Sequence, residues 1–293
     1  MILRIADLFL EVLCECELAK SLPNLIPFLM DVPLREKDEL ITRLETACSL
    51  NSEIGMPMLT TVLEGRTLSV WLKPHTCSVQ LTFHHSNHSF LLQTDRRWRH
   101  VKTNWTPLQE NASVALNDFI MLSFIYSAAF HQTVLFHASS VSIGNKGCAF
   151  VGPSGIGKST HSQLWIKNIS GTRLLNDDQP ILRLLPDGSI RIYGSPWSGK
   201  TPCYQNRGVE LEALFFMEQA NANKITKLDV IESYHRLLQA TSLISNDTES
   251  FAAISETQAR VISMVPAFKL ENLPVKAAAE LSYQTFISLK HRY

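Results

Sequence analysis

The sequence has no excess of charge of either sign. Its 293 residues contain 27 Lys and Arg against 27 Asp and Glu. Proteins that bind nucleic acid or anionic membranes usually carry a positive patch or a positive net charge. We therefore expect neither nucleic acid nor a membrane among the partners of this chain.

Long apolar segments and an export signal are also missing. The longest apolar run, residues 119–130, is about twelve residues long and contains Ser123 and Ser127. A bilayer-spanning helix needs roughly 20 apolar residues, so this run favours a core helix. Asp7 and Glu11 occur where a secretory signal would be apolar. These features predict a cytoplasmic protein whose cysteines are free thiols.

Residues with metal-ligand spacing are scarce. The pair Cys14 and Cys16 has no second Cys or His pair at a suitable distance along the chain. His84, His85 and His88 lie together at a predicted turn. Either group could bind a metal, but solvated or structural side chains are the favoured interpretation of both.

Glycine is rare in the first part of the chain, with only two between residues 1 and 115. Residues 11–20 and 36–50 have apolar spacings that indicate helices. Residues 58–101 consist of short strand-like pieces separated by turns, which indicates an antiparallel meander. We predict a smaller α+β domain over residues 1–110, with a role in recognising a substrate or a partner.

One glycine-rich stretch stands out in the second part of the chain. An apolar strand over residues 148–151 is followed by the pattern G-x-x-x-x-G-K-[ST] and then by a helix. Glycines allow several backbone N–H groups to face one anion, and the helix adds the positive end of its dipole. We expect these residues to bind nucleotide phosphates: Gly152, Pro153, Ser154, Gly155, Ile156, Gly157, Lys158, Ser159 and Thr160.

Two acidic residues follow the phosphate loop at a short interval. A right-handed crossover through a helix would make the strand over residues 172–178 run parallel to the strand before the loop. Asp177 and Asp178 would then emerge beside the loop, although two solvated turn acids are the simpler alternative. A glycine- and proline-rich loop over residues 194–204 carries Lys200, a candidate contact for the γ-phosphate.

The order of these features resembles a known family. His137 lies on a predicted strand over residues 133–143, before the Gly-Pro-Ser-Gly-Ile-Gly-Lys-Ser loop and the Asp177-Asp178 pair. This order is similar to that of the catalytic domain of HPr kinase/phosphorylase, whose fold is shared with phosphoenolpyruvate carboxykinase. The resemblance implies an α/β phosphate-loop domain with α+β character over residues 111–293. The segment that follows the acids in that family is matched only loosely, by residues 206–209.

The resemblance also implies an activity and assigns roles. The γ-phosphoryl of ATP would pass to a hydroxyl group, of a Ser or Thr in a peptide or protein or of a small molecule. Lys158 would neutralise the phosphates, and Ser159 and Asp178 would hold Mg²⁺. Asp177 would act as general base, and His137 would adjust the charge state of the acids. On the sequence alone, a structural core histidine is an equally good interpretation of His137.

Two other functions stay open at this point. The loop could serve a nucleotide-binding regulatory or adaptor protein that transfers no phosphate. The enzyme could instead be a phosphorylase that acts on a phosphoserine. The family resemblance also implies that the chain could form a homo-oligomer, since HPr kinases assemble as hexamers.

Overall fold

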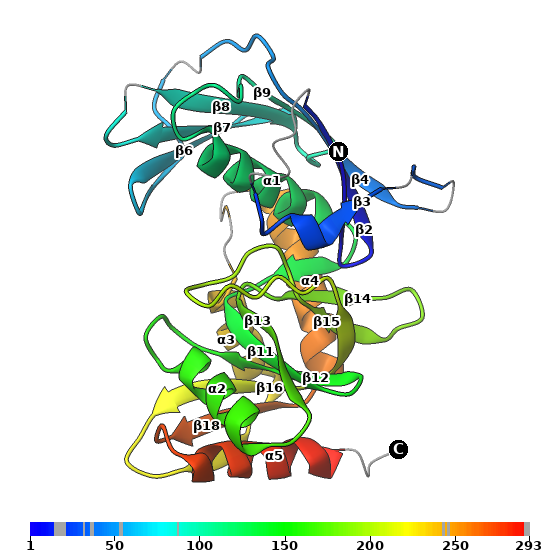
Figure 1. The fold of residues 1–293 in the computed structure, drawn as a ribbon, viewed down its shortest axis with the longest axis vertical. Coiled ribbons are helices and arrows are strands. Elements are labelled where there is room, and N and C mark those ends of the chain that lie inside the picture. Colours follow the sequence, from blue (N-terminus) through cyan, green and yellow to red (C-terminus); the bar gives the residue numbers. More distant parts are fainter. Residues whose placement is uncertain are drawn as a thin grey trace. The chain divides into compact units, whose positions relative to one another are not determined.

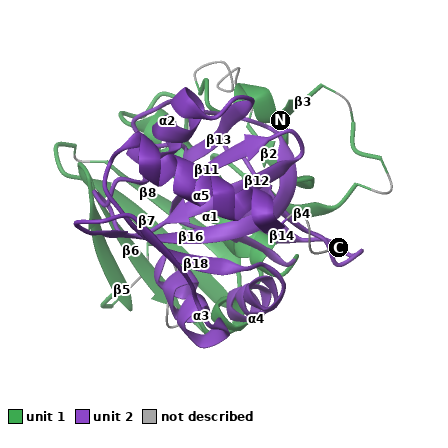
Figure 2. Cartoon of the chain, turned by 90° about the horizontal axis from the view of Figure 1, so that it is seen from below, with its two compact units in different colours: residues 1–131, 244–252 green, residues 132–243, 253–293 purple. Residues whose placement is uncertain are grey.

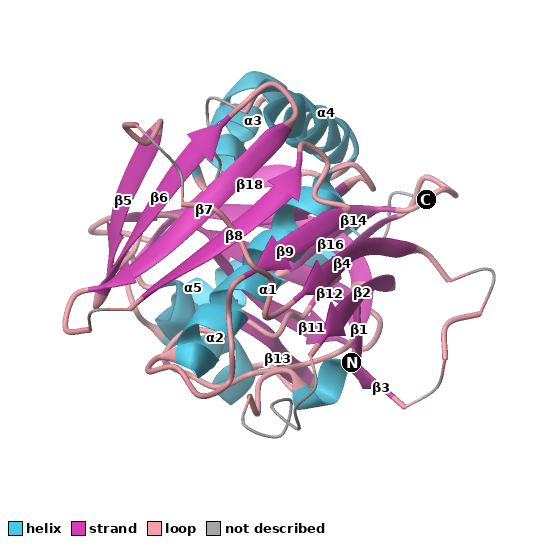
Figure 3. Cartoon of the chain, turned by 90° about the horizontal axis from the view of Figure 1, so that it is seen from above, coloured by secondary structure: helices cyan, strands magenta, loops and turns pink. Residues whose placement is uncertain are grey.

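The computed structural model describes residues 1–14, 22–31, 33–35, 38–52, 55–86, 88–241, 244 and 247–289. In this part of the chain it shows a mixed α/β protein with two nine-stranded sheets and five α-helices (Figures 1 and 3). The chain divides into two compact units (Figure 2). Unit 1 contains residues 1–131 and 244–252, and unit 2 contains residues 132–243 and 253–293.

Unit 1 is built on a sheet with the strand order β3-β1-β2-β4-β9-β8-β7-β6-β5. A turn of 3₁₀ helix over Ile26–Phe28 precedes β3. The strands are β1 (Ile2–Ile5), β2 (Leu8–Leu13), β3 (Leu29–Met30), β4 (Leu40–Glu45), β5 (Leu59–Leu63), β6 (Arg66–Leu72), β7 (Thr76–Phe83), β8 (Ser89–Asp95) and β9 (His100–Thr103).

The predicted meander is confirmed, because each strand from β5 to β9 pairs antiparallel with the next. The two predicted helices are wrong where the structure describes them. Residues 11–13 belong to β2, and residues 40–45 form β4, which pairs in parallel with both β2 and β9. Short apolar runs suit a buried strand as well as a helix, and here pairing with two neighbours decides the outcome. Residues 15–20 of the first predicted helix lie outside the described residues.

Helix α1 (Ala112–Ala129) belongs to unit 1. The Asp118 carboxylate accepts hydrogen bonds from Arg66 Nε at 2.6 Å and Nη2 at 3.0 Å. The ring of Tyr126 stacks on Trp98, with 4.9 Å between the ring centroids. Because of such contacts the chain leaves unit 1 after residue 131, about twenty residues beyond the boundary predicted near residue 110.

By length and composition, α1 alone among the described helices is apolar enough to cross a membrane. Of its 18 residues, 72% are buried within the structure. Core helices of soluble proteins have the same properties, so the helix is weak grounds for a membrane span.

Unit 2 is built on a second sheet, in which β10-β14-β15-β16-β12-β11-β13 lie in this order and β18 pairs with both β16 and β17. Its strands are β10 (Thr133–Leu135), β11 (Ala138–Ile143), β12 (Lys146–Val151), β13 (Thr172–Asp178), β14 (Ile181–Leu184), β15 (Ile190–Tyr193), β16 (Gly208–Gln219), β17 (Lys224–Lys227) and β18 (Ala267–Asn272). Its helices are α2 (Lys158–Asn168), α3 (Val230–Gln239), α5 (Lys276–Ser288) and most of α4 (Thr248–Met264).

Helices cover both faces of the second sheet, as Figure 2 shows. On one face, Trp165 of α2 packs edge-on against Phe150 of β12 and Phe286 of α5, with 5.6 Å between centroids in both pairs. On the other face, Leu237 of α3 and Val261 of α4 join a second apolar cluster. These two cores hold α2 and β12 rigidly, and the glycine-rich loop connects them.

Candidate functional site

The candidate site lies at one edge of the second sheet, where three neighbouring strands meet. Strand β11 lies between β12 and β13 and is antiparallel to both. Its first residue, Ala138, therefore pairs with Val151 at the end of β12 and with Asp178 at the end of β13. The phosphate loop, the start of β11 and the acidic pair are thus brought to the same edge.

The predicted strand over residues 133–143 is interrupted at this edge. It forms β10 and β11, with Phe136 and His137 between them. The backbone N–H of Phe136 donates to Pro180 O at 3.3 Å, and that of His137 donates to Ala240 O at 2.7 Å. The break places His137 directly before β11, between the phosphate loop and the acids.

The loop after β12 has the backbone of an anion-binding turn. Gly155 and Gly157 have φ angles of +79° and +107°, in the left-handed region that residues with a Cβ rarely adopt. Gly157 also caps the N-terminus of α2, and within the described part of the chain this helix has no side-chain N-cap hydrogen bond. The first turn of α2 therefore offers unsatisfied donors and a positive dipole end, as a phosphate site requires.

Lys158, His137 and Asp178 form a chain of polar contacts. The Nδ1 atom of His137 lies 2.9 Å from Asp178 Oδ1, and its Nε2 atom lies 2.9 Å from Lys158 Nζ. A carboxylate accepts and an ammonium donates, so a neutral imidazole protonated at Nδ1 satisfies both neighbours. Lys158 Nζ also donates to Gly152 O at 2.8 Å and Pro153 O at 3.0 Å. Burial lowers the pKa of Lys158, while Asp178 and Asp177 act in the opposite direction.

Asp177 has a separate set of partners and is buried. Ser139 on β11 donates its hydroxyl proton to Asp177 Oδ1 at 2.7 Å. Ser162 on α2 lies 2.6 Å from the Ser139 oxygen and must be the donor in that pair, because Ser139 has only one proton. These bonds fix one carboxylate oxygen of Asp177 relative to β11 and the helix after the phosphate loop.

Asn176 holds the acids against the loop over residues 194–204. Its Oδ1 accepts from the backbone N–H groups of Asp178 at 2.9 Å and Gln179 at 2.7 Å. Its Nδ2 donates to Ser195 Oγ at 3.1 Å and to Trp197 O at 3.0 Å. With the side chain fully buried, these four bonds connect the two segments rigidly.

Gly199 lies in the same loop and contacts the acidic pair closely. A Cβ atom added there would lie 2.9 Å from Asp177 O and 3.4 Å from Asp178 Cβ. Only a residue without a side chain allows this approach. Lys200 follows it and is exposed, so its contact with a γ-phosphate stays a prediction.

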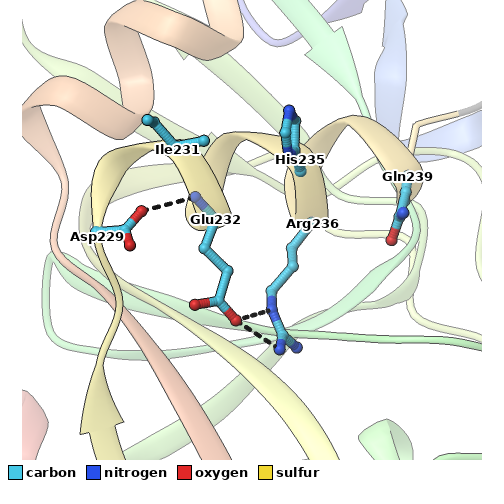
Figure 4. A pocket seen from close by; sticks show the side chains of 6 residues that line it. All are labelled: Asp229, Ile231, Glu232, His235, Arg236 and Gln239. Carbon is cyan, nitrogen blue, oxygen red and sulfur yellow. Dashed lines mark hydrogen bonds and ion pairs between the residues drawn. The ribbon is translucent and has the colours of Figure 1, made fainter.

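Two pockets lie on the α3 side of the phosphate loop. One has a volume of about 260 Å³ and is lined by His137, Gly152, Met217 and Arg236, among others. The second, of about 590 Å³, is lined by residues of α3 and by Asp229 before it, and it shares Arg236 and Gln239 with the first (Figure 4). Arg236 donates to Glu232 and Glu218, so its charge is compensated within unit 2.

Comparisons with known proteins give little additional information. No protein-family model matches the chain, and no curated protein matches it. Among solved structures, it is similar to the HPr(Ser) kinase/phosphatase from Coxiella burnetii, with a TM-score of 0.31 and 14% identity. This alignment covers 54% of the present chain and 95% of the other. This neighbour is therefore distant in both sequence and fold.

The structure brings together most of the residues that the sequence predicts for this site. Strand β13 runs in the same direction as β12, as predicted, but β11 lies between them. Ser159 and Thr160 are exposed on the first turn of α2. Sequence reasoning missed Ser139, Ser162 and Asn176. Three buried serines in one short strand, Ser139, Ser140 and Ser142, were the available signal.

The metal signals of unit 1 gain no support. Within the described ranges, no group of three or more His, Cys, Asp and Glu residues could hold a metal ion. His84 Nε2 lies 2.9 Å from the hydroxyl of Thr67, a partner that explains its orientation. Cys16 lies outside the described residues. The thiols of Cys48, Cys148 and Cys203 are free.

Proposed function

We propose that the chain is an ATP-dependent phosphotransferase that moves the γ-phosphoryl of Mg·ATP to a hydroxyl group. The acceptor would be a Ser or Thr of a peptide or protein, or a small molecule. One observation carries the proposal: a glycine-rich loop with its lysine, a histidine and two adjacent acids meet at one sheet edge. A structural glycine turn would need none of the other groups.

The loop fits the phosphates of a nucleotide. The uncapped N-terminus of α2 and the left-handed glycines Gly155 and Gly157 supply backbone donors. The ammonium of Lys158 faces the carbonyls of Gly152 and Pro153. A phosphate oxygen carries more negative charge than these neutral acceptors and would bind the ammonium more strongly.

The acids fit Mg²⁺ in the manner of kinases. Such sites hold the ion through one or two protein oxygens together with phosphate oxygens and water. Ser159 and Asp178 would provide the protein oxygens, and the ion would supply neutralisation of charge on the phosphates. A dedicated cluster of carboxylates is therefore not required.

Asp177 would act as the general base. Ser139 donates to its Oδ1 atom, so Oδ2 would take the proton from the acceptor hydroxyl. The acceptor oxygen would form a bond to the γ-phosphorus while the bond from that phosphorus to the bridging oxygen of ADP breaks. His137 would orient Asp178 and Lys158 through its two ring nitrogens. Lys200 would contact the transferred group from the neighbouring loop.

We infer a cytoplasmic protein that binds nucleotide and an acceptor, with neither nucleic acid nor a membrane as partner, and that could form a homo-oligomer. The balanced charge of the chain supports the expectation that neither nucleic acid nor a membrane is a partner. Unit 1 would contribute to the choice of acceptor.

The first test is Lys158→Ala. We expect binding of a fluorescent ATP analogue, measured by anisotropy, to weaken at least about a hundredfold, because the ammonium contacts the phosphates. Circular dichroism should show an intact fold. Lys167→Ala removes an exposed lysine from the same helix and should leave affinity unchanged. Unaltered binding by Lys158→Ala would disprove the phosphate-loop assignment.

The second test is Asp177→Asn, which keeps the shape of the side chain and removes its basicity. ATP labelled at the γ-phosphate is incubated with a pool of Ser- and Thr-containing peptides and small alcohols. Transfer should drop by about a hundredfold or more while Mg·ATP affinity is retained. Asp187→Asn, in an exposed turn, is the control. Binding without transfer in the wild-type chain would favour a regulator, and pyrophosphate release from a phosphopeptide and phosphate would favour a phosphorylase.

A further inference from the structure

Unit 1 contains a pocket of about 440 Å³ where β4 and β9 begin and α1 ends. Five of its lining residues carry cationic or titratable basic groups, namely Arg43, Arg97, Arg99, His100 and His131. The other lining residues are uncharged, so no carboxylate lines the pocket within the described part of the chain. Such a concentration of one sign is unusual in a protein with balanced net charge.

The turn between β8 and β9 is built to present two of these arginines. Asp95 Oδ1 accepts from the backbone N–H of Arg97 at 2.8 Å. Its Oδ2 accepts from the N–H groups of Arg99 at 3.1 Å and His100 at 2.9 Å. The carboxylate nearest in sequence is therefore engaged by the backbone, and it shapes the turn around the two guanidinium groups.

Trp98, between the two arginines, has an unusual backbone conformation. Its φ angle is +57°, which is uncommon for a bulky residue. Its indole is fully buried and stacks on Tyr126. This anchor leaves Arg97 and Arg99 both exposed on the surface of the turn. Conformations of this kind persist where the surrounding structure enforces them, and they cluster at ligand sites.

The described residues do not neutralise these two arginines with a carboxylate. Arg97 lies over the ring of Phe130, with 5.2 Å from its guanidinium carbon to the ring centroid. No ion pair to Arg97 or Arg99 occurs among the described residues. Arg96 shows the contrast, since it pairs with the buried Asp247.

Two other basic groups of the pocket, on its β4 and α1 side, have acidic partners. Arg43 donates to Glu11 at 2.5 Å, and His131 hydrogen-bonds Glu39 at 2.7 Å. Carboxylates thus neutralise the basic groups at one side of the pocket, but none neutralises the two arginines at the β8–β9 turn. The missing negative charge marks where an anion would bind.

We propose that this pocket binds a small ligand with two or more carboxylate or phosphate groups. Guanidinium groups bind both oxyanions through paired N–H donors, and the cation–π contact with Phe130 orients Arg97 for that purpose. The volume suits a small molecule. This site is independent of the phosphotransfer proposed for unit 2, because every residue that forms it belongs to unit 1.

The experiment is a calorimetric titration of the full chain with pyrophosphate alone and with citrate alone, at fixed ionic strength. Five proteins are compared: wild type, Arg97→Ala, Arg99→Ala, Arg260→Ala and Lys158→Ala. Arg260 is exposed on α4 outside unit 1 and controls for net charge. We expect each pocket variant to weaken binding of at least one probe by about tenfold or more. Arg260→Ala should change affinity less than about twofold.

The Lys158→Ala chain separates this site from the phosphate loop. Binding that survives in Lys158→Ala and is lost in Arg99→Ala supports the pocket. Absence of both probes from the pocket, or equal losses in Arg260→Ala and Arg99→Ala, overturns the proposal. An acidic peptide that binds more tightly than either probe and depends on Arg97 and Arg99 would also overturn it, in favour of a protein partner. Failure of the ATP-binding tests on unit 2 would leave these results unaffected.

Discussion

His161 lies on α2, one turn after Lys158, and should make the stability of the protein depend on pH. Its ring is 1% exposed and packs edge-on against Phe150, with 4.6 Å between centroids. Its Nε2 atom lies 2.9 Å from the hydroxyl of Ser282, while Nδ1 has no hydrogen-bond partner among the described residues. Burial lowers the pKa of His161 from 6.5 to about 4.

The direction of the effect follows from this pKa. Between about pH 6.5 and pH 4, His161 is protonated in the unfolded chain but not in the folded chain. The free energy of unfolding therefore falls as the pH decreases. The difference between 6.5 and about 4 corresponds to roughly 3 kcal/mol in total. About 2 kcal/mol of this should be lost between about pH 7.5 and pH 5. Protonation would create a second N–H, at Nδ1, in a place without an acceptor.

The assay is urea unfolding followed by circular dichroism at these two pH values. The free energy of unfolding of the wild type should fall by about 2 kcal/mol more than that of His161→Leu, which cannot be protonated. His235→Leu makes the same change at an exposed site on α3 and should keep the wild-type pH dependence. Equal pH dependence in wild type and His161→Leu would refute the reasoning. So would an NMR titration of the His161 ring with a midpoint near its ordinary value.

Two further substitutions test how the acidic pair is positioned. Asn176→Asp replaces a donating amide by a carboxylate oxygen that faces Trp197 O. We therefore expect the free energy of unfolding in urea to fall by about 3 kcal/mol or more, together with a loss of phosphoryl transfer. A free energy of unfolding within about 1 kcal/mol of the wild-type value would contradict this. Gly199→Ala places a methyl group against the Asp177 carbonyl, and transfer should fall about tenfold or more while ATP-analogue affinity changes little. Gly188→Ala, in an open turn with a φ of +85°, strains the backbone without contacting the acidic pair, so it controls for destabilisation and should leave transfer unchanged.

The parts of the site that depend on local sequence could be predicted. A glycine pattern between an apolar strand and a helix specifies its own backbone, so the loop and Lys158 were found directly. Local signals of this kind need no knowledge of the rest of the fold.

Features that depend on strand pairing could not be predicted. Nothing in the residues of β11 indicates that it separates β12 from β13, yet that insertion is what places His137 between the lysine and Asp178. Asn176 gains its importance only from the return of the loop over residues 194–204. Strand β4 was misread as a helix because its partners are distant in sequence. The arginines at residues 97 and 99 share a pocket with Arg43 only because β4 and β9 pair.

The discontinuity of unit 1 has a consequence for how the protein is made. Residues 244–252, which include the Asp247 partner of Arg96, are synthesised about 110 residues after the rest of that unit. A ribosome adds roughly 5–20 residues each second, so the first 131 residues must wait several seconds for their last segment. During that interval a buried acid and the start of α4 are missing from unit 1. Unit 1 can therefore be completed only after the ribosome has synthesised the segment that carries the glycine-rich loop.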